Sequence, residues 1–299
     1  AVFVVPLVGG IVVAAAGVKL VQNVGERSNT TLDILSVVLL AAGITAFVYS
    51  VGEFSTNLIA GIATLFAAIV LLGLFAARQL KLEHPVLNVR PMASVRFWPA
   101  CLLVVVSMMT TFSMSVLLPL YFEGAYGMTA LVAGLLILPA IACNVVTSIV
   151  GGRVMDARGA WPLLPVGFAL IAVGQTVISM TAASMNIGVV VALTVVVYAG
   201  VGLVLSPSQT AGLETLPVAE HPHGTALLNT WNMIAASFGP SLFIGLLSSS
   251  AATAGVAGVA TDVAQAIGFA AAVRVAAVIA VVGFATSLVY ARRESQMSH

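Results

Sequence analysis

The sequence predicts an all-α membrane protein, a bundle of about nine transmembrane helices. Of its 299 residues, 61% are hydrophobic and only 7% are charged, and the mean hydropathy is +1.15. Soluble domains carry about a quarter charged residues, so a water-soluble globule is excluded. The net charge of +1, without a basic run, gives no basis for binding nucleic acid. Cys101 and Cys143 lie singly in apolar runs and indicate neither disulfides nor a metal site.

Charge-free apolar intervals locate the spans, because a membrane-crossing helix needs about 20 mostly apolar residues. Four such intervals lie before residue 123. The 55 residues between Arg158 and Glu214 carry no charged side chain, which is too long for one crossing, and a polar turn around Asn186 divides them into two. The same reasoning along the whole chain predicts helices at residues 2–21, 33–51, 55–77, 97–120, 129–150, 161–181, 187–206, 224–247 and 267–290.

Lys and Arg set the predicted orientation, since cytoplasmic loops carry the excess of basic residues. If the first span runs inward, ten of the eleven basic residues are cytoplasmic, and the eleventh, Arg274, lies within the last span. The charged residues of the outside loops are then all acidic: Glu53, Glu123 and Asp262. One missed helix would swap every later loop and scramble this asymmetry. The pattern therefore supports nine spans and a cytoplasmic C-terminus.

The organisation of the spans follows from the linkers. The chain starts with Ala1 and enters an apolar helix without the basic region or cleavage site of a signal peptide, which predicts a truncated start. The longest polar linker, residues 78–96, divides three leading spans from six trailing ones. Residues 128–131 (MTAL) and 224–227 (GTAL) echo one another, each after a segment that contains proline. This echo is a weak indication of the three-plus-three repeats of transporter halves.

Short motifs follow one another in a fixed order along the chain. Residues 117–122 read LLPLYF, and residues 151–160 read GGRVMDARGA. The other motifs are Gly127, residues 133–135 (AGL), 138–139 (LP), 3–7 (FVVPL), 32–33 (LD) and 224–230 (GTALLNT). Together they resemble the Major Facilitator Superfamily, and more narrowly its fourteen-span drug:proton antiporter branch.

The resemblance implies an architecture of six spans, two central spans and six more. Residues 1–22 would be the last helix of the N-terminal half. Residues 23–96 would hold the two central linker helices and a cytoplasmic loop. Residues 97–299 would form a complete C-terminal six-helix bundle with a short cytoplasmic tail. The fold class implied is a major-facilitator-like helix bundle.

The same resemblance implies a proton-coupled secondary transporter of a bacterial-type cytoplasmic membrane. It would export hydrophobic or cationic drugs by alternating access, with the proton gradient as energy source and no cofactor. The family's antiporter signature and proton carboxylate belong to the first half, so the missing N-terminal half is an expected partner and the chain alone is expected not to transport. One alternative is an exporter of a specific metabolite or peptide, and another is a non-transporting membrane scaffold or gene remnant.

The loop motif between the fifth and sixth spans is a candidate gate. It holds Gly152, Arg153, Asp156, Arg158 and Gly159, and the glycines allow a tight turn. By resemblance this loop clamps helix ends in one access state, since acids near helix N-termini and bases near C-termini are favourable partners. The alternative is a solvated turn of the kind that any cytoplasmic loop carries.

Polar residues within the spans are candidates for a substrate cavity. Thr225, Asn229 and Asn232 follow an i, i+4, i+7 spacing, so they are expected on one face of the eighth helix. Polar groups in a span rarely face lipid, so this face meets either a cavity or a neighbouring helix. Ser107 and Thr111 on the fourth helix raise the same two alternatives, and there interhelical hydrogen bonding is favoured.

Three residues interrupt the helical pattern, and one base lies within a span. Pro139, Gly239 and Pro240 predict kinks, which could be hinges for alternating access or static bends. Arg274 is expected to snorkel outward or to pair with an acid of the outside loops. No His-x-Glu or Ser/Lys constellation lies within a span, which argues against an intramembrane enzyme.

Overall fold

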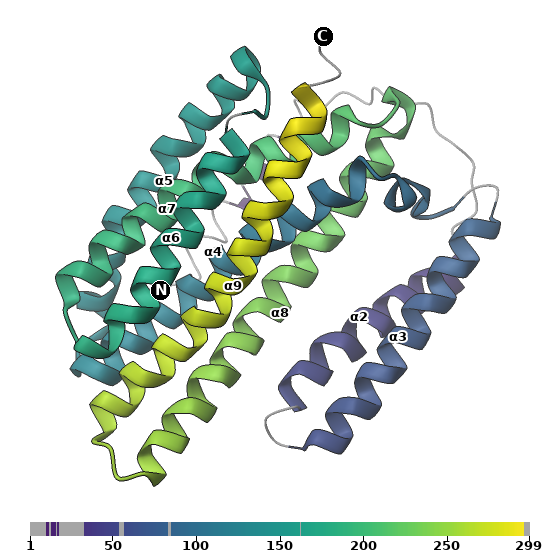
Figure 1. The fold of residues 1–299 in the computed structure, drawn as a ribbon. Coiled ribbons are helices and arrows are strands. Elements are labelled where there is room, and N and C mark those ends of the chain that lie inside the picture. Colours follow the sequence, from purple (N-terminus) through teal and green to yellow (C-terminus); the bar gives the residue numbers. More distant parts are fainter. Residues whose placement is uncertain are drawn as a thin grey trace. The chain divides into compact units, whose positions relative to one another are not determined.

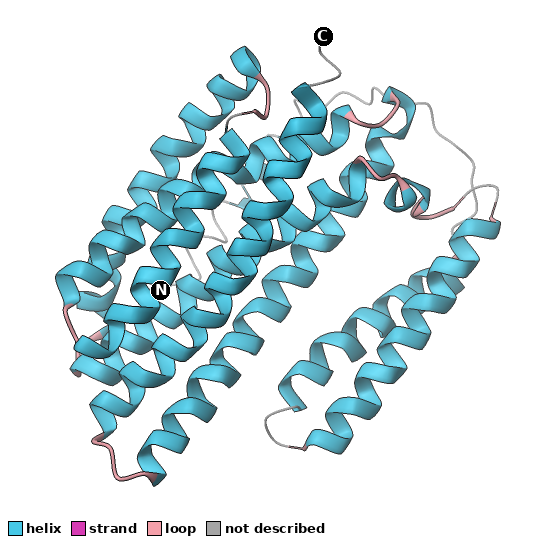
Figure 2. Ribbon diagram, in the orientation of Figure 1, coloured by secondary structure: helices cyan, strands magenta, loops and turns pink. Residues whose placement is uncertain are grey.

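The computed structural model describes residues 33–53, 57–82, 85–161 and 163–295, together with positions 10, 11, 13–15 and 17. The chain divides into two units, Ala1–Leu32 and Asp33–His299. All the helices named below belong to the second unit, whose described part contains no strand (Figure 2). The predicted first span, its FVVPL motif and the predicted boundary at residue 22 lie largely or wholly outside the described residues.

Eight long helices account for the other eight predicted spans, and each is long and apolar enough to cross a membrane. They are α2 (Ile34–Glu53), α3 (Leu58–Lys81), α4 (Phe97–Tyr126), α5 (Ala130–Arg158), α6 (Leu163–Thr181), α7 (Ile187–Glu214), α8 (His221–Val256) and α9 (Thr261–Ser295). Short 3₁₀ turns lie between some of them: η1 (Arg90–Ala93), η2 (Ala182–Ser184) and η3 (Val218–Glu220).

Several helices extend beyond the predicted spans, which corrects the expected boundaries. α5 continues from residue 150 to Arg158, and α7 continues from residue 206 to Glu214. Hydropathy marks only the part of a helix that crosses hydrocarbon, whereas the helix itself ends where a cap stops it. For α4 that stop is Gly127, which has φ 64° and donates its N–H to the carbonyl of Glu123.

A polar network joins α2 to α3. Arg78 binds Asp33 through two hydrogen bonds, Nε to Oδ2 at 2.8 Å and NH2 to Oδ1 at 3.2 Å. The Ser36 hydroxyl donates to Asp33 (2.6 Å) and accepts from Gln79 Nε2 (2.6 Å), while Gln79 Oε1 accepts the Leu87 N–H (3.1 Å). The hydrogen bonds from Arg78 and Ser36 lower the pKa of Asp33 to about 2. The network therefore fixes the α2–α3 hairpin and the start of the loop that follows it.

The loop after α3 is packed against the six-helix bundle. Leu87 belongs to a buried cluster with Phe97 and Cys101 of α4 and with residues of α8. The Trp231 indole also donates to the sulfur of Met92, at 3.4 Å. The longest polar linker is thus a structured connection between the central pair and the bundle.

The helix contacts of the bundle support the predicted three-plus-three repeat (Figure 1). Exchanging α4 with α7, α5 with α8 and α6 with α9 maps the α5–α7 contact onto α8–α4, and the α6–α7 contact onto α9–α4. α6 and α9 pack against each other, as do α4 and α7. One pair departs from the symmetry, since α8 packs along α9 whereas α5 makes few contacts with α6. The two halves of the bundle are therefore similar but not equivalent.

Candidate functional site

The α8 helix presents an exposed line of mostly polar residues. Its buried side includes Leu227, Leu228 and Phe243 and packs on α4 and α9. Thr225 and Asn229 are exposed, and the line continues at i+4 spacing through Met233 and Ser237, which are exposed as well. Thr225 and Asn229 were predicted from the sequence, whereas Ser237 was not, although the same i+4 spacing could have located it.

Asn229 differs from its polar neighbours in having no hydrogen-bond partner within the described part of the chain. The hydroxyls of the line bond to their own helix: Thr225 donates to the carbonyl of His221 (2.9 Å), and Ser237 donates to that of Met233 (3.0 Å). Hydroxyls can satisfy themselves in this way, whereas the longer carboxamide projects from the helix surface. Asn229 is the group on this line that is available for a ligand.

The two asparagines of α8 do not face one way, and this corrects the prediction of a shared face. Asn232 is 9% exposed and its Oδ1 has no partner among the described residues, whereas Asn229 is exposed. The i+3 spacing places the two side chains about 60° apart around the helix. That angle suffices to turn one of them into the bundle and the other out of it.

On α4, the predicted cavity residues turn inward. Ser107 is fully buried, and its hydroxyl donates to the carbonyl of Leu103 at 2.9 Å. Thr111 is half-buried and donates to the carbonyl of Ser107 at 2.8 Å. Ser107 is buried because α4 is surrounded by α7, α8 and α9, which agrees with the favoured alternative that it faces neighbouring helices. The expected hydrogen bonds between helices are corrected, since both hydroxyls donate to carbonyls of α4 itself.

The α5–α7 contact contains a hydrogen bond between helices. The Asn144 side chain on α5 donates to the carbonyl of Tyr198 on α7 at 3.0 Å. Near it, Gly202 of α7 lies against α5 so closely that an added Cβ would come within 2.6 Å of the Asn144 carbonyl oxygen. Such close approach between small residues, supported by a polar contact, is typical of helix pairs in membranes.

The candidate gate lies on the last turns of α5, not in a loop as predicted. Arg153, Asp156 and Arg158 are exposed, and Gly159 ends the helix with φ 74°. None of the three charged side chains forms an ion pair with a described residue. Gly159 lies at the turn as expected, whereas Gly152 is half-buried within the helix, about two turns earlier, and takes no part in the turn. The clamp itself stays a prediction.

The proline and glycine positions lie inside continuous helices. Pro139 is within α5 and Pro240 is within α8. Gly239 is buried against α4, and an added Cβ would meet Ser113 Oγ at 2.9 Å and Met109 Cα at 3.2 Å. The close approach of α8 to α4 therefore explains why a glycine, with no Cβ, occupies position 239. The hinge role stays a prediction.

Arg274 lies on the exposed side of α9 without an ion pair to any described residue. The surrounding exposed residues of α9, Val278, Val281 and Val282, are apolar. Helical side chains lean toward the N-terminus of their helix, which for α9 is the predicted outside end. This direction agrees with the predicted outward snorkelling, and no ion pair to Asp262 or Glu123 forms in the described part of the chain.

Comparison with known proteins identifies the family. A model described as the Major Facilitator Superfamily matches residues 1–240 of the chain. This chain belongs to the Major Facilitator Superfamily. Membership makes it a multi-pass membrane protein of a transporter family rather than an enzyme, and the α4–α9 bundle fits that family.

Three relatives bear on the type of transporter. The chain is 30% identical over 236 residues to the lincomycin resistance protein LmrB of Listeria monocytogenes, covering 78% of this chain and 50% of that protein. It is 25% identical to a multidrug resistance protein B homolog of Mycobacterium tuberculosis (74% of this chain, 42% of that protein). It is 22% identical to the riboflavin transporter RibZ of Clostridioides difficile (83% and 54%). The chain spans about half the length of these relatives.

Proposed function

We propose that this chain supplies the second half of a proton-driven exporter of hydrophobic or cationic drugs. The observation that carries the proposal is the exposed polar line of α8, Thr225, Asn229 and Ser237, with a carboxamide that has no partner in the described chain. A polar line within a membrane span is expensive against lipid. The line therefore faces an aqueous cavity shared with the other half of the transporter.

The chemistry of this surface suits apolar and weakly polar substrates. Apolar substrates gain free energy by leaving water for the apolar parts of the cavity wall, and Asn229 can donate and accept a hydrogen bond. No metal or organic cofactor is needed, since alternating access moves one helical bundle against the other around the bound substrate.

The proton carrier is proposed to lie elsewhere in the complete protein. Acidic side chains of the described spans lie near the ends of their helices: Glu123 in the last turn of α4, Glu214 at the end of α7 and Asp262 at the start of α9. A carboxylate at a hydrated helix end is poorly placed to couple proton movement across the membrane. The N-terminal half is the proposed partner and the source of that carboxylate.

The gate is proposed to act at the cytoplasmic side. The excess of basic residues supports a cytoplasmic location for the end of α5 and for the C-terminus of the chain, in a bacterial-type cell. Arg153, Asp156 and Arg158 are exposed there. In the closed state they would pair with helix ends of the other half and hold that side shut.

A specific-metabolite exporter is the second candidate, favoured by the similarity to the riboflavin transporter. The two candidate functions predict different results when a second compound competes for export. Chemically unrelated dyes compete for export by a multidrug transporter, whereas only close analogues compete for a specific one. A scaffold or gene remnant would support no export at all.

The test is efflux from bacteria that lack their own drug exporters and express the complete reading frame encoding this chain. We expect lower accumulation of ethidium and resistance to lincomycin, both abolished by a protonophore. Absence of efflux despite membrane expression would refute the exporter, and efflux insensitive to the protonophore would refute proton coupling. Asn229→Ala is expected to weaken efflux, and Ser249→Ala, another exposed polar position on α8, is the matched control.

A further inference from the structure

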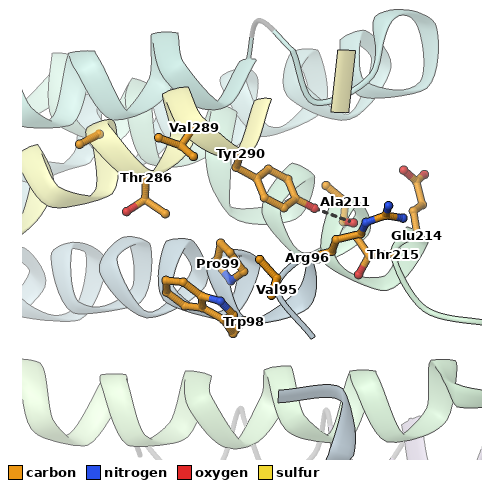
Figure 3. Close-up of a pocket in the computed structure, with 11 residues that line it drawn as sticks. Val95, Arg96, Trp98, Pro99, Ala211, Glu214, Thr215, Thr286, Val289 and Tyr290 are labelled. Carbon is orange, nitrogen blue, oxygen red and sulfur yellow. Dashed lines mark hydrogen bonds between the residues drawn. The ribbon is translucent and has the colours of Figure 1, made fainter. Parts of the chain in front are cut away.

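A pocket of about 550 Å³ lies where α4 begins and where α7 and α9 approach their C-terminal ends. Figure 3 shows its lining, which combines apolar side chains, the hydroxyl-bearing Thr215, Thr286 and Tyr290, and two charged side chains. Tyr290 closes one side, with its hydroxyl donating to the carbonyl of Ala211 at 3.0 Å. The volume falls within the range of small-molecule sites. The pocket shares no residue with the polar line of α8.

The pocket opens beside an apolar, lipid-type surface. Ala285 and Val289 line it and also continue the exposed apolar residues of α9, Val278 and Val282. Trp98, which is 44% exposed, lines the pocket as well. Indole rings concentrate at the level of the lipid headgroups. A molecule could therefore enter this pocket from the membrane without first dissolving in water.

The charges of the pocket are one base and one acid that do not pair with each other. Arg96 and Glu214 are both exposed and lie at the same end of the lining in Figure 3. Neither side chain forms an ion pair or a hydrogen bond with another side chain in the described part of the protein. The pocket thus offers a set of guanidinium donors and a separate carboxylate acceptor, next to an apolar wall.

We propose that the pocket binds the headgroup of a zwitterionic aminophospholipid. The guanidinium of Arg96 would bind the phosphate, and the carboxylate of Glu214 would accept hydrogen bonds from the primary ammonium. The apolar residues of α9 would cover the upper part of an acyl chain. The position fits the predicted cytoplasmic leaflet, because the basic residues place this end of the bundle at the cytoplasmic surface.

The pairing of charges selects among phospholipids. An anionic headgroup without an amine would satisfy Arg96 but leave a carboxylate beside a negative phosphate. A choline headgroup carries the positive charge, yet its methylated nitrogen has no N–H to donate to Glu214. Phosphatidylethanolamine meets both requirements, so it is the predicted occupant.

The experiment is native mass spectrometry of the protein, expressed from its complete reading frame and purified in detergent. Phosphatidylethanolamine, phosphatidylglycerol and phosphatidylcholine with identical acyl chains are titrated separately. We expect phosphatidylethanolamine to bind about tenfold more tightly than the other two, the size of one charge-assisted hydrogen bond. Equal binding of the three lipids would overturn the proposal.

Variants separate the roles of the two charges. Arg96→Gln should weaken the binding of all three lipids, whereas Glu214→Gln should weaken phosphatidylethanolamine alone, by about tenfold. Lys81→Gln and Glu220→Gln remove charges near the same end of the protein but outside the pocket, so they should change nothing. Ala285→Trp should fill the mouth and exclude every lipid while keeping both charges.

Two results would contradict the assignment. If Glu214→Gln weakens the binding of all three lipids equally, Glu214 does not recognise the ammonium group. If tetraphenylphosphonium binds with a dependence on Glu214 but not on Arg96, while phosphatidylethanolamine does not bind, then the pocket is a site for cations. Because the assay measures lipid binding and not transport, its failure would leave the proposed export function untouched.

Discussion

α5 and α8 occupy equivalent places in the two repeats of the bundle, yet their exposed surfaces differ. Before its charged last turns, α5 exposes apolar side chains, among them Leu131, Leu138 and Val146. α8 exposes Thr225, Asn229 and Ser237 on one line. Lipid or apolar helices can cover the first surface, whereas the second needs water or polar partners. Equivalent positions in the topology therefore do not give the two helices equivalent surroundings.

The two helices also differ in how many neighbouring helices hold them in place. α5 is held chiefly by α7, where Gly202 brings the two backbones together. α8 is held by both α4 and α9, with Gly239 against α4. A helix fixed on two sides keeps its polar line in a defined direction, which a substrate-binding surface requires.

The largest expected effect breaks the α5–α7 contact. In Gly202→Ala the new Cβ would lie 2.6 Å from the Asn144 carbonyl oxygen and 3.0 Å from the Ser148 nitrogen, both backbone atoms that cannot rotate away. We expect a loss of about 3 kcal/mol in the free energy of unfolding, the upper end for overpacking. Gly239→Ala should cost less, about 1 kcal/mol, because the Ser113 hydroxyl can turn.

Thermal or denaturant unfolding in detergent measures these differences. Gly134→Ala on α5 is the matched control for Gly202→Ala, and Gly245→Ala on α8 is the control for Gly239→Ala. Neither control would meet an atom within 4 Å. A control that destabilises as much as its partner would show that the close approaches are not what hold the helices.

The next effect concerns the polar line. Asn229→Leu should lower ethidium efflux about tenfold. Leucine removes the carboxamide, so the bound substrate loses one hydrogen bond to the cavity wall. Stability should stay unchanged, since the side chain is exposed and has no partner within the described residues. Unchanged efflux in cells with equal expression would remove Asn229 from the site.

A smaller effect is expected at a buried amide. Gln175 on α6 is fully buried, and neither of its amide atoms has a partner in the described protein. Gln175→Met keeps the volume and removes the unmet polar groups, so it should raise the free energy of unfolding by about 1 kcal/mol. A loss of stability, measured by the same unfolding assay, would mean that a bound water or ion satisfies the amide.

The smallest effect is the pH dependence of the α2–α3 network. Arg78 and Ser36 lower the pKa of Asp33 from 3.8 to about 2. Because this pKa is lower in the folded protein, the ionised Asp33 stabilises the fold at pH values above 3.8. That stabilisation is lost as the pH falls from 3.8 through about 2. The difference in melting temperature between the protein and Asp33→Asn should therefore be constant above pH 5 and shrink below pH 4. A difference that grows on acidification would reverse this sign.

Much of the fold could be predicted from the sequence, because crossing a membrane imposes a length and a composition on each helix. The helix ends at Arg158 and Glu214 could not, since helices continue into water until a cap stops them. Within the site, Thr225 and Asn229 were found by spacing. The burial of Asn232, away from the exposed Asn229, escaped prediction, because the rotation of a helix about its axis depends on its neighbours. The burial of Ser107 agrees with the alternative that the sequence favoured, a residue facing neighbouring helices.

The proposed aqueous cavity borders the α8 line and not the α5 surface. Its direct test is labelling with a membrane-impermeant thiol reagent, in inside-out vesicles, after Cys101 and Cys143 are replaced by alanine. Asn229→Cys and Ser237→Cys should react, and a transported drug should protect them. Leu138→Cys and Val146→Cys on α5 should stay unlabelled. Equal labelling of both helices, or none on α8, would contradict the account.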